Sequence, residues 1–110
     1  MEFRKYMNGR VKINVAEQGD GPVILCVHGW PELWYSWRHQ MSRFSEAGYR
    51  VCAMDVRGYG ETSKPLDVGS YSLKNLASDV ASVAAQISED PVVLFGHDWG
   101  APIVWHTALL

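Results

Sequence analysis

Two uninterrupted apolar runs, at residues 23–27 and 92–95, and a largely apolar run at 51–56 that contains Asp55, alternate with segments whose apolar residues recur at helical spacing. A continuous run of this length is typical of a strand that is covered on both faces of a sheet. The helical segments carry apolar stripes, formed by Trp34, Trp37, Met41 and Phe44 in the first and by Leu73, Leu76, Val80, Val83 and Ile87 in the second. Buried strands that alternate with amphipathic helices predict crossover connections and a parallel sheet.

The segment before the first buried strand predicts an antiparallel hairpin. Residues 3–7 alternate loosely between apolar and polar side chains, and residues 11–15 alternate cleanly. Asn8-Gly9 between them favours a tight turn, so we expect one face of the hairpin to be buried. The fold class is therefore α/β, with an antiparallel hairpin followed by parallel strands and crossover helices. We expect Ser72 to cap the second helix and a further helix to begin at Ala101.

The loop after the second buried strand is rich in Gly, Ser, Thr and Pro and covers residues 57–70. We expect Asp55, just before this loop, and Arg57, at its start, to hold the loop in place rather than to react. No internal repeat or linker divides the chain, so we expect a single structural unit. The last helix reaches Leu110 without a stop signal, and three parallel strands leave an unpaired sheet edge. We therefore expect residues 1–110 to be a truncated part of a domain that is marginally stable or prone to aggregate.

Charge and composition narrow the classes of partner. The net charge is −2 with no block of like charge, which argues against a nucleic-acid or anionic-membrane surface. No apolar run has the length of a membrane span, and residues 1–6 lack the apolar stretch of a signal peptide, so we expect a cytoplasmic protein. Four histidines without paired spacing predict no metal site, and no cofactor motif is present. Cys26 and Cys52 are expected to be small buried side chains rather than a disulfide or a reactive thiol.

The strongest chemical signal is Gly96-His97-Asp98-Trp99-Gly100, which lies between a buried strand and a helix. It has the small-x-nucleophile-x-small spacing of a nucleophile elbow, with Asp98 in the place that a serine usually takes. The central residue of such a turn is strained so that its side chain projects above the sheet, and close passage of strand and helix requires small residues at both ends. The alternative is that Asp98 is only the N-cap of the following helix.

A second turn supports the catalytic interpretation. The first buried strand ends in His28-Gly29-Trp30-Pro31, and the loop at this position supplies one backbone N–H of an oxyanion hole in enzymes with such an elbow. The residue after the nucleophile supplies the other. We therefore expect the backbone N–H groups of Trp30 and Trp99 to form the oxyanion hole, and Trp30, Pro31 and Trp99 to contact the substrate.

Three motifs together resemble one family. Residues 28–38, which begin His28-Gly29-Trp30-Pro31, residues 55–65 and residues 96–102 are similar to the corresponding segments of soluble epoxide hydrolases of the α/β-hydrolase superfamily, and they occur in that family's order. The resemblance implies that residues 1–110 are the N-terminal part of an α/β-hydrolase core domain, without its lid and C-terminal core. It also implies hydrolysis of a small-molecule epoxide by water to a vicinal diol, with no cofactor.

The carboxylate itself points to the same chemistry. A serine that attacks a saturated carbon would form an ether, whereas Asp98 would form an ester that water can cleave. Asp98 is also ionised near neutral pH without help from a base, because the reference pKa of an aspartate is about 3.9. Asp at the elbow therefore predicts substrates that are attacked at a saturated carbon bearing a leaving oxygen or halide.

Two alternatives remain open. A haloalkane dehalogenase would use the same Asp98, although many such enzymes carry Asn at the position of Trp30. The chain could also be a non-catalytic, truncated module, because the lid tyrosines, the histidine base and its carboxylate partner that the resemblance implies would all follow Leu110. These motifs leave substrate size, stereoselectivity and oligomeric state open.

Overall fold

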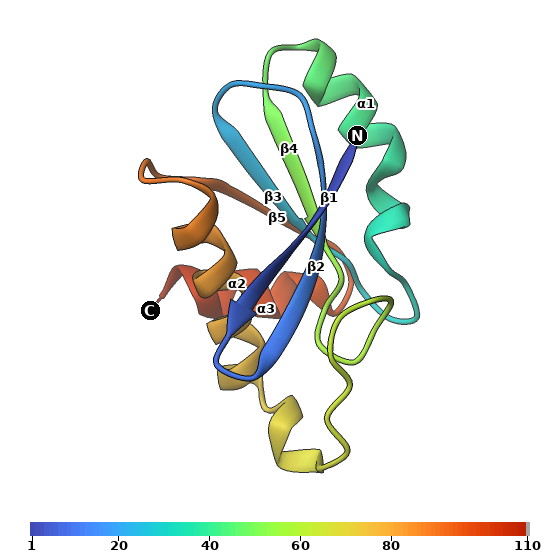
Figure 1. Ribbon diagram of the computed structural model, residues 1–110, viewed down its shortest axis with the longest axis vertical. Coiled ribbons are helices and arrows are strands. Elements are labelled where there is room, and N and C mark those ends of the chain that lie inside the picture. Colours follow the sequence, from blue (N-terminus) through green and yellow to red (C-terminus); the bar gives the residue numbers. More distant parts are fainter. Residues whose placement is uncertain (110) are drawn as a thin grey trace.

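A computed structural model describes residues 1–109, which form one five-stranded mixed sheet with helices on both faces (Figure 1). The strand order is β1-β2-β4-β3-β5. The bounds are Glu2–Asn8 for β1, Val11–Gln18 for β2, Val23–Val27 for β3, Arg50–Met54 for β4 and Val93–Gly96 for β5. β1 and β2 form the predicted antiparallel hairpin, and β3 pairs in parallel with both β4 and β5. The predicted fold class is confirmed.

The helices divide between the two faces of the sheet (Figure 1). Helix α1 (Arg38–Glu46) packs on one face through Met41, whereas α2 (Leu73–Ile87) and α3 (Gly100–Ala108) pack on the other. Strand residues alternate between the two faces, so that Leu25 joins the core under α2 and α3 while Cys26 joins the core under α1. Among residues 1–109, none of the helices has both the length and the apolar character needed to cross a bilayer.

Several expected details differ from the structure. The helix expected from Trp34 begins with a 3₁₀ turn, η1 (Trp34–Trp37), before α1. β4 ends at Met54 rather than at residue 56, because the N–H of Val56 donates to a His28 ring nitrogen instead of to a neighbouring strand. β5 is not a buried strand: Val93 is 52% exposed, because β5 lies at the edge of the sheet in the described part of the chain.

The hairpin is also buried differently from the prediction of one covered face. Most of β1 is exposed, whereas β2 is buried on both faces, and Asn14 is as fully enclosed as Val15. The reason is that β2 lies between β1 and β4, and that the loop after β4 folds over it. Asn14 Nδ2 donates to Asp55 Oδ2 at 2.9 Å, and the Asn14 N–H donates to Thr62 Oγ1 at 2.9 Å.

The loop after β4 is held by the two residues that the sequence singled out. The Asp55 carboxylate accepts hydrogen bonds from the N–H groups of Trp34 and Glu61. The Arg57 guanidinium forms a two-point ion pair with Asp79 of α2, at 2.7 and 2.8 Å. A short 3₁₀ turn, η2 (Val68–Tyr71), leads from this loop to α2, where Ser72 caps the helix as predicted. The prediction that Asp55 and Arg57 fix the loop is confirmed.

Candidate active site

The turn between β5 and α3 holds Asp98 in an unusual backbone conformation. Its φ is +58°, and in residues 1–109 every other positive φ belongs to a glycine. A left-handed backbone is unfavourable for residues with a Cβ, and it is found where the surrounding structure imposes it. The N-cap of α3 is Trp99, and no side chain caps this helix. The alternative interpretation of Asp98 as an N-cap is therefore wrong, and its exposed side chain is directed elsewhere.

Crowding at both ends of the turn explains its glycines. A Cβ built on Gly96 would lie 2.6 Å from the carbonyl oxygen of Gly100. A Cβ built on Gly100 would overlap the carbonyl oxygen of Val27, at the end of the neighbouring strand β3. Both contacts would be closer than a carbon and an oxygen atom tolerate. The strand and the helix can therefore approach this closely only with glycine in both places.

The carboxylate of Asp98 is held by the loop after β3. The backbone N–H of Trp30 donates a hydrogen bond to Asp98 Oδ2 at 3.1 Å. This hydrogen bond, followed by one from the backbone N–H of Trp99, lowers the pKa of Asp98 below its usual value. The approach requires Gly29, because a Cβ at that position would overlap the Asp98 side chain. The structure thus brings together the carboxylate and the two backbone donors that the sequence singled out.

Two histidines flank these segments, and their environments differ. His28 is buried, and its Nε2 accepts a hydrogen bond from the N–H of Val56 at 2.9 Å, which leaves Nδ1 to donate to the Gly29 carbonyl at 2.8 Å. Burial lowers the pKa of His28, so the ring is neutral and anchors the loop. The His97 side chain is mostly exposed, and its Nδ1 lies 3.5 Å from Glu32 Oε1.

Glu32 is a contact that the sequence reasoning missed. Its Oε1 accepts a hydrogen bond from the N–H of Gly29 at 2.9 Å, while its own N–H donates back to the Gly29 carbonyl at 3.2 Å. These two bonds close the turn that presents the Trp30 N–H to Asp98. A carboxylate three residues after a glycine, in a turn that follows a strand, was the available signal. The hydrogen bond from Gly29 lowers the pKa of Glu32, so this side chain is ionised at neutral pH.

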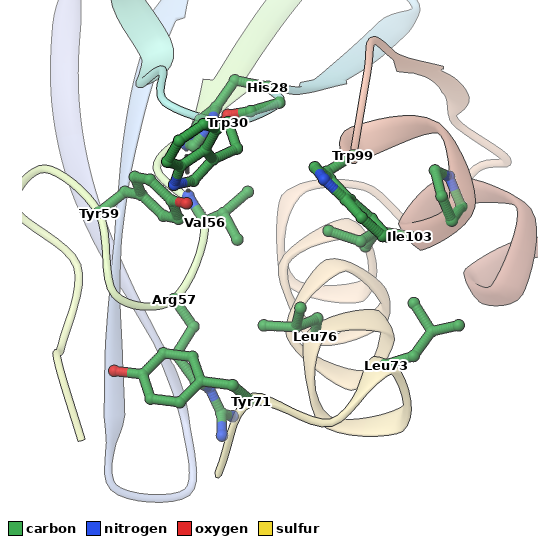
Figure 2. A pocket seen from close by; sticks show the side chains of 12 residues that line it. His28, Trp30, Val56, Arg57, Tyr59, Tyr71, Leu73, Leu76, Trp99 and Ile103 are labelled. Atoms are coloured by element: carbon green, nitrogen blue, oxygen red, sulfur yellow. Dashed lines mark hydrogen bonds between the residues drawn. The ribbon is translucent and has the colours of Figure 1, made fainter. Parts of the chain in front are cut away.

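A cavity of about 540 Å³, partly open to solvent, lies beside this turn (Figure 2). Trp30 and Trp99 line it, whereas Pro31 is not among its lining residues. The sequence reasoning missed the wall that α2 contributes, because α2 is distant from both motifs in the chain. The remaining lining residues come from the ends of β3 and β4 and from η2, α2 and α3: His28, Gly29, Val56, Arg57, Tyr59, Tyr71, Leu73, Leu76, Pro102 and Ile103.

The two cysteines do not line this cavity. Cys26 and Cys52 are free and buried, as predicted, and burial raises the pKa of each thiol to about 12. In the part of the chain that the structure describes, no group of three or more His, Cys, Asp or Glu side chains is placed to hold a metal ion.

Comparison with known proteins agrees with this architecture. The family model described as the alpha/beta hydrolase fold matches residues 22–110. The chain belongs to the alpha/beta hydrolase fold family. Within this family, the positive φ of Asp98 and the crowded glycines on either side of it have the geometry of a nucleophile elbow.

Several relatives of this chain are named as epoxide hydrolases. The chain is 46% identical over 99 residues to epoxide hydrolase 3 of Siraitia grosvenorii, covering 90% of this chain and 31% of that protein. It is 42% identical over 102 residues to epoxide hydrolase A of Mycobacterium tuberculosis, covering 91% of this chain and 32% of that protein. The resemblance to epoxide hydrolases drawn from the three motifs is confirmed.

Solved structures show the same likeness. The crystal structure of an epoxide hydrolase from Vigna radiata superposes with a TM-score of 0.96 at 44% identity, covering 99% of this chain and 35% of that chain. An epoxide hydrolase from an endophytic Streptomyces gives a TM-score of 0.95 at 43% identity, covering 99% of this chain and 33% of that chain. The present chain thus spans about a third of the length of these relatives.

Proposed function

We propose that this alpha/beta hydrolase chain carries the nucleophile of an epoxide hydrolase, which converts epoxides to vicinal diols through an ester on Asp98. The observation that carries the proposal is the hydrogen bond from the Trp30 N–H to Asp98 Oδ2, at a turn where Asp98 has a φ of +58°. A carboxylate in this position can attack a saturated carbon and afterwards be released by water. The relatives named as epoxide hydrolases support the choice of substrate class.

The first half-reaction uses both carboxylate oxygens. Oδ1 attacks an epoxide carbon, the carbon–oxygen bond of the ring breaks, and its electron pair leaves as an alkoxide that takes up a proton from an acid. The resemblance to epoxide hydrolases implies that two lid tyrosines supply this acid. Oδ2 becomes the carbonyl oxygen of the ester and stays against the N–H of Trp30.

The second half-reaction releases the diol. A water molecule, deprotonated by the histidine base that the resemblance implies, attacks the ester carbon and places a negative charge on Oδ2. The backbone N–H groups of Trp30 and Trp99 form the oxyanion hole for this charge, and such donors are worth about 10²–10³ in rate. The ester bond to the substrate then breaks, and the released alkoxide takes up the proton held by the histidine. Asp98 gives up the proton of its new hydroxyl group, which restores the acid of the first half-reaction, and returns to its carboxylate form.

The acid and the base of this mechanism are not among the residues described above, which leads to a proposal about the extent of the chain. We propose that residues 1–110 are the N-terminal part of an alpha/beta hydrolase core domain, and that lid and C-terminal core segments supply the acid and the base. Trp30, Pro31 and Trp99 are the proposed substrate contacts, and a small-molecule epoxide and water are the proposed partners. We also propose a cytoplasmic location, which the two free buried thiols support, because reducing compartments keep thiols unpaired.

Intact mass spectrometry after incubation with styrene oxide tests the proposal. Solvent water can supply, more slowly, the proton that the lid tyrosines would give, and without a base the ester should accumulate. We therefore expect one added mass of the epoxide, mapped by peptide digestion to Asp98. The matched control is Asp98→Asn, which keeps the side-chain shape and tolerates the left-handed backbone but removes the charged nucleophile. An adduct that persists in Asp98→Asn, or no adduct on a folded chain, would contradict the proposal. Faster bromide release from 1-bromobutane than ester formation from the epoxide would favour the dehalogenase instead.

A further inference from the structure

The cavity lies beside the turn that carries Asp98, and residues of α2 and α3 form one side of it (Figure 2). Trp30 and Trp99, whose backbone N–H groups contact the Asp98 carboxylate, both line it. An epoxide bound at Asp98 therefore has this cavity as its neighbour. Its volume of about 540 Å³ lies within the range of about 300–1,000 Å³ that is usual for small-molecule sites.

The far wall of the cavity offers apolar contact. Figure 2 shows Leu76 and Ile103 together on the side formed by α2 and α3, with Trp99 above them and Trp30 on the opposite side. Ile103 is almost completely buried in the core, whereas Leu76 is only partly buried and packs against the edge of that core. Leu76 can thus change in size without emptying the core, and it lies deeper in the wall than Leu73, which is 42% exposed.

Two polar side chains of the wall, those of Arg57 and Tyr71, are already engaged by the protein. The Arg57 guanidinium is paired with Asp79 and also donates to the Ser70 carbonyl at 2.7 Å. The Tyr71 hydroxyl donates to the Pro65 carbonyl at 2.6 Å. Neither group is free to compensate a charged or strongly hydrated part of a ligand, and burying such a part without partners is costly. The part of the cavity lined by Arg57, Tyr71 and Leu76 is therefore suited to a hydrocarbon group.

We infer that the apolar substituent of the epoxide, an aryl or branched hydrocarbon group, lies between Trp99 and Leu76, and that Leu76 sets the largest substituent that the site accepts. The inference rests on the proposed function for the position of the reactive ring at Asp98. Its own content, the apolar subsite on α2, can be measured with a ligand that carries no epoxide.

The test compares two epoxides and one unreactive ligand on the 110-residue chain and its variants. Styrene oxide carries the aryl group, 1,2-epoxypropane carries only a methyl group, and 2-phenylethanol carries the aryl group without an epoxide. Leu76→Phe fills the subsite, and Leu76→Ser removes its apolar contact without adding bulk. Lys74→Phe is the matched control, because Lys74 is an exposed residue of the same helix that does not line the cavity.

In Leu76→Phe, we expect the rate of ester formation from styrene oxide to fall by about tenfold or more, as is usual when an apolar pocket loses the space for a group of this size. The rate with 1,2-epoxypropane should change less than about twofold. Leu76→Ser should weaken binding of 2-phenylethanol, measured by calorimetry, and Lys74→Phe should change neither quantity. Equal losses for both epoxides, or unchanged binding of 2-phenylethanol in both Leu76 variants, would overturn the inference.

The same measurements distinguish failure of the proposed function from failure of the inferred subsite. No ester on Asp98 from either epoxide, together with binding of 2-phenylethanol that depends on Leu76, would contradict the epoxide chemistry and support the apolar subsite. Normal ester formation that is indifferent to every Leu76 variant would support the chemistry and overturn the subsite.

Discussion

The backbone N–H of Trp30 donates to Asp98 Oδ2 at 3.1 Å, although the two residues are 68 positions apart in the chain. The bond joins the loop after β3 to the turn after β5, and these are neighbouring parallel strands. The carboxyl ends of parallel strands lie at the same edge of a sheet, which is why the pairing of β3 with β5 brings the two turns together. The donor is therefore in place before any substrate arrives.

This hydrogen bond leads to a prediction about the pH dependence of ester formation. Bonds from Trp30 and Trp99 favour the charged form, so the pKa of Asp98 lies below its usual value of 3.8. Asp98 is then an ionised nucleophile throughout the range above that value, and its activity is lost only as the pH falls through the lowered pKa. We expect the rate of adduct formation to be constant between pH 8 and about pH 5.

Intact mass spectrometry at several pH values measures this rate, with Asp98→Asn giving the background from acid-catalysed opening of the epoxide. A background-corrected rate that falls between pH 7 and pH 5 would show that the carboxylate is not held in its charged form as the structure indicates.

The crowded glycines of the elbow lead to a second prediction. Gly100 has an ordinary helical φ, so the cost of Gly100→Ala arises from overlap of the new methyl group with the Val27 carbonyl. We expect a loss of more than about 2 kcal/mol in the free energy of unfolding, measured by urea denaturation. Gly9→Ala is the control, because Gly9 has a φ of +61° but a methyl group added there would have nothing within 4 Å. It should cost only about 1–2 kcal/mol from backbone strain, and a larger loss there than at Gly100 would contradict the steric argument.

Much of the fold could be predicted from local pattern. The apolar runs located β3, β4 and β5, and the Asn8-Gly9 turn located the hairpin, because periodicity reports which side chains are buried. Burial of individual faces could not be predicted in the same way. Val93 is exposed because β5 lies at the edge of the sheet, and Asn14 is enclosed because a loop many residues later folds over it. Both depend on strand order and on loop packing, which no local pattern contains.

Some features of the candidate site could also be predicted from the sequence, and others could not. The spacing around Asp98 could be read from the sequence because its cause is steric and local. The Trp30 contact could be anticipated only because the resemblance and the elbow supplied the position of its loop. Leu76, in contrast, is an ordinary member of an apolar stripe. Its place beside the site follows from the packing of α2 against α3, so the sequence held no signal that separates it from its core neighbours.

The ion pair between Arg57 and Asp79 leads to a third prediction. Both side chains are almost fully buried, and Asp79 also accepts a hydrogen bond from Asn8 Nδ2 at 2.8 Å. Removal of one partner leaves the other as an uncompensated buried charge, so Asp79→Leu should cost about 3–5 kcal/mol in the free energy of unfolding. The double variant Arg57→Met, Asp79→Leu should cost less than Asp79→Leu alone.

A double-mutant cycle in urea measures this difference, with Arg57→Met as the remaining corner. Additive losses from the two single variants would show that the pair does not act as a unit. Because Arg57 also holds the Ser70 carbonyl, binding of 2-phenylethanol should weaken in Arg57→Met along with stability.

The two buried thiols lead to a last prediction, about alkaline pH. Burial raises the pKa of Cys26 and of Cys52 from 9.0 to about 12 in the folded chain. Above pH 9 the unfolded chain loses these protons while the folded chain keeps them, so the stability present below pH 9 is lost as the pH rises toward 12. Ionisation of each thiol in the unfolded chain should lower the free energy of unfolding by up to about 1.4 kcal/mol per pH unit in that range. Urea denaturation between pH 8 and pH 11 measures the slope. The free energy of unfolding should fall less steeply with pH in Cys26→Ala than in the unsubstituted chain. Identical slopes would show that Cys26 does not resist ionisation in the core.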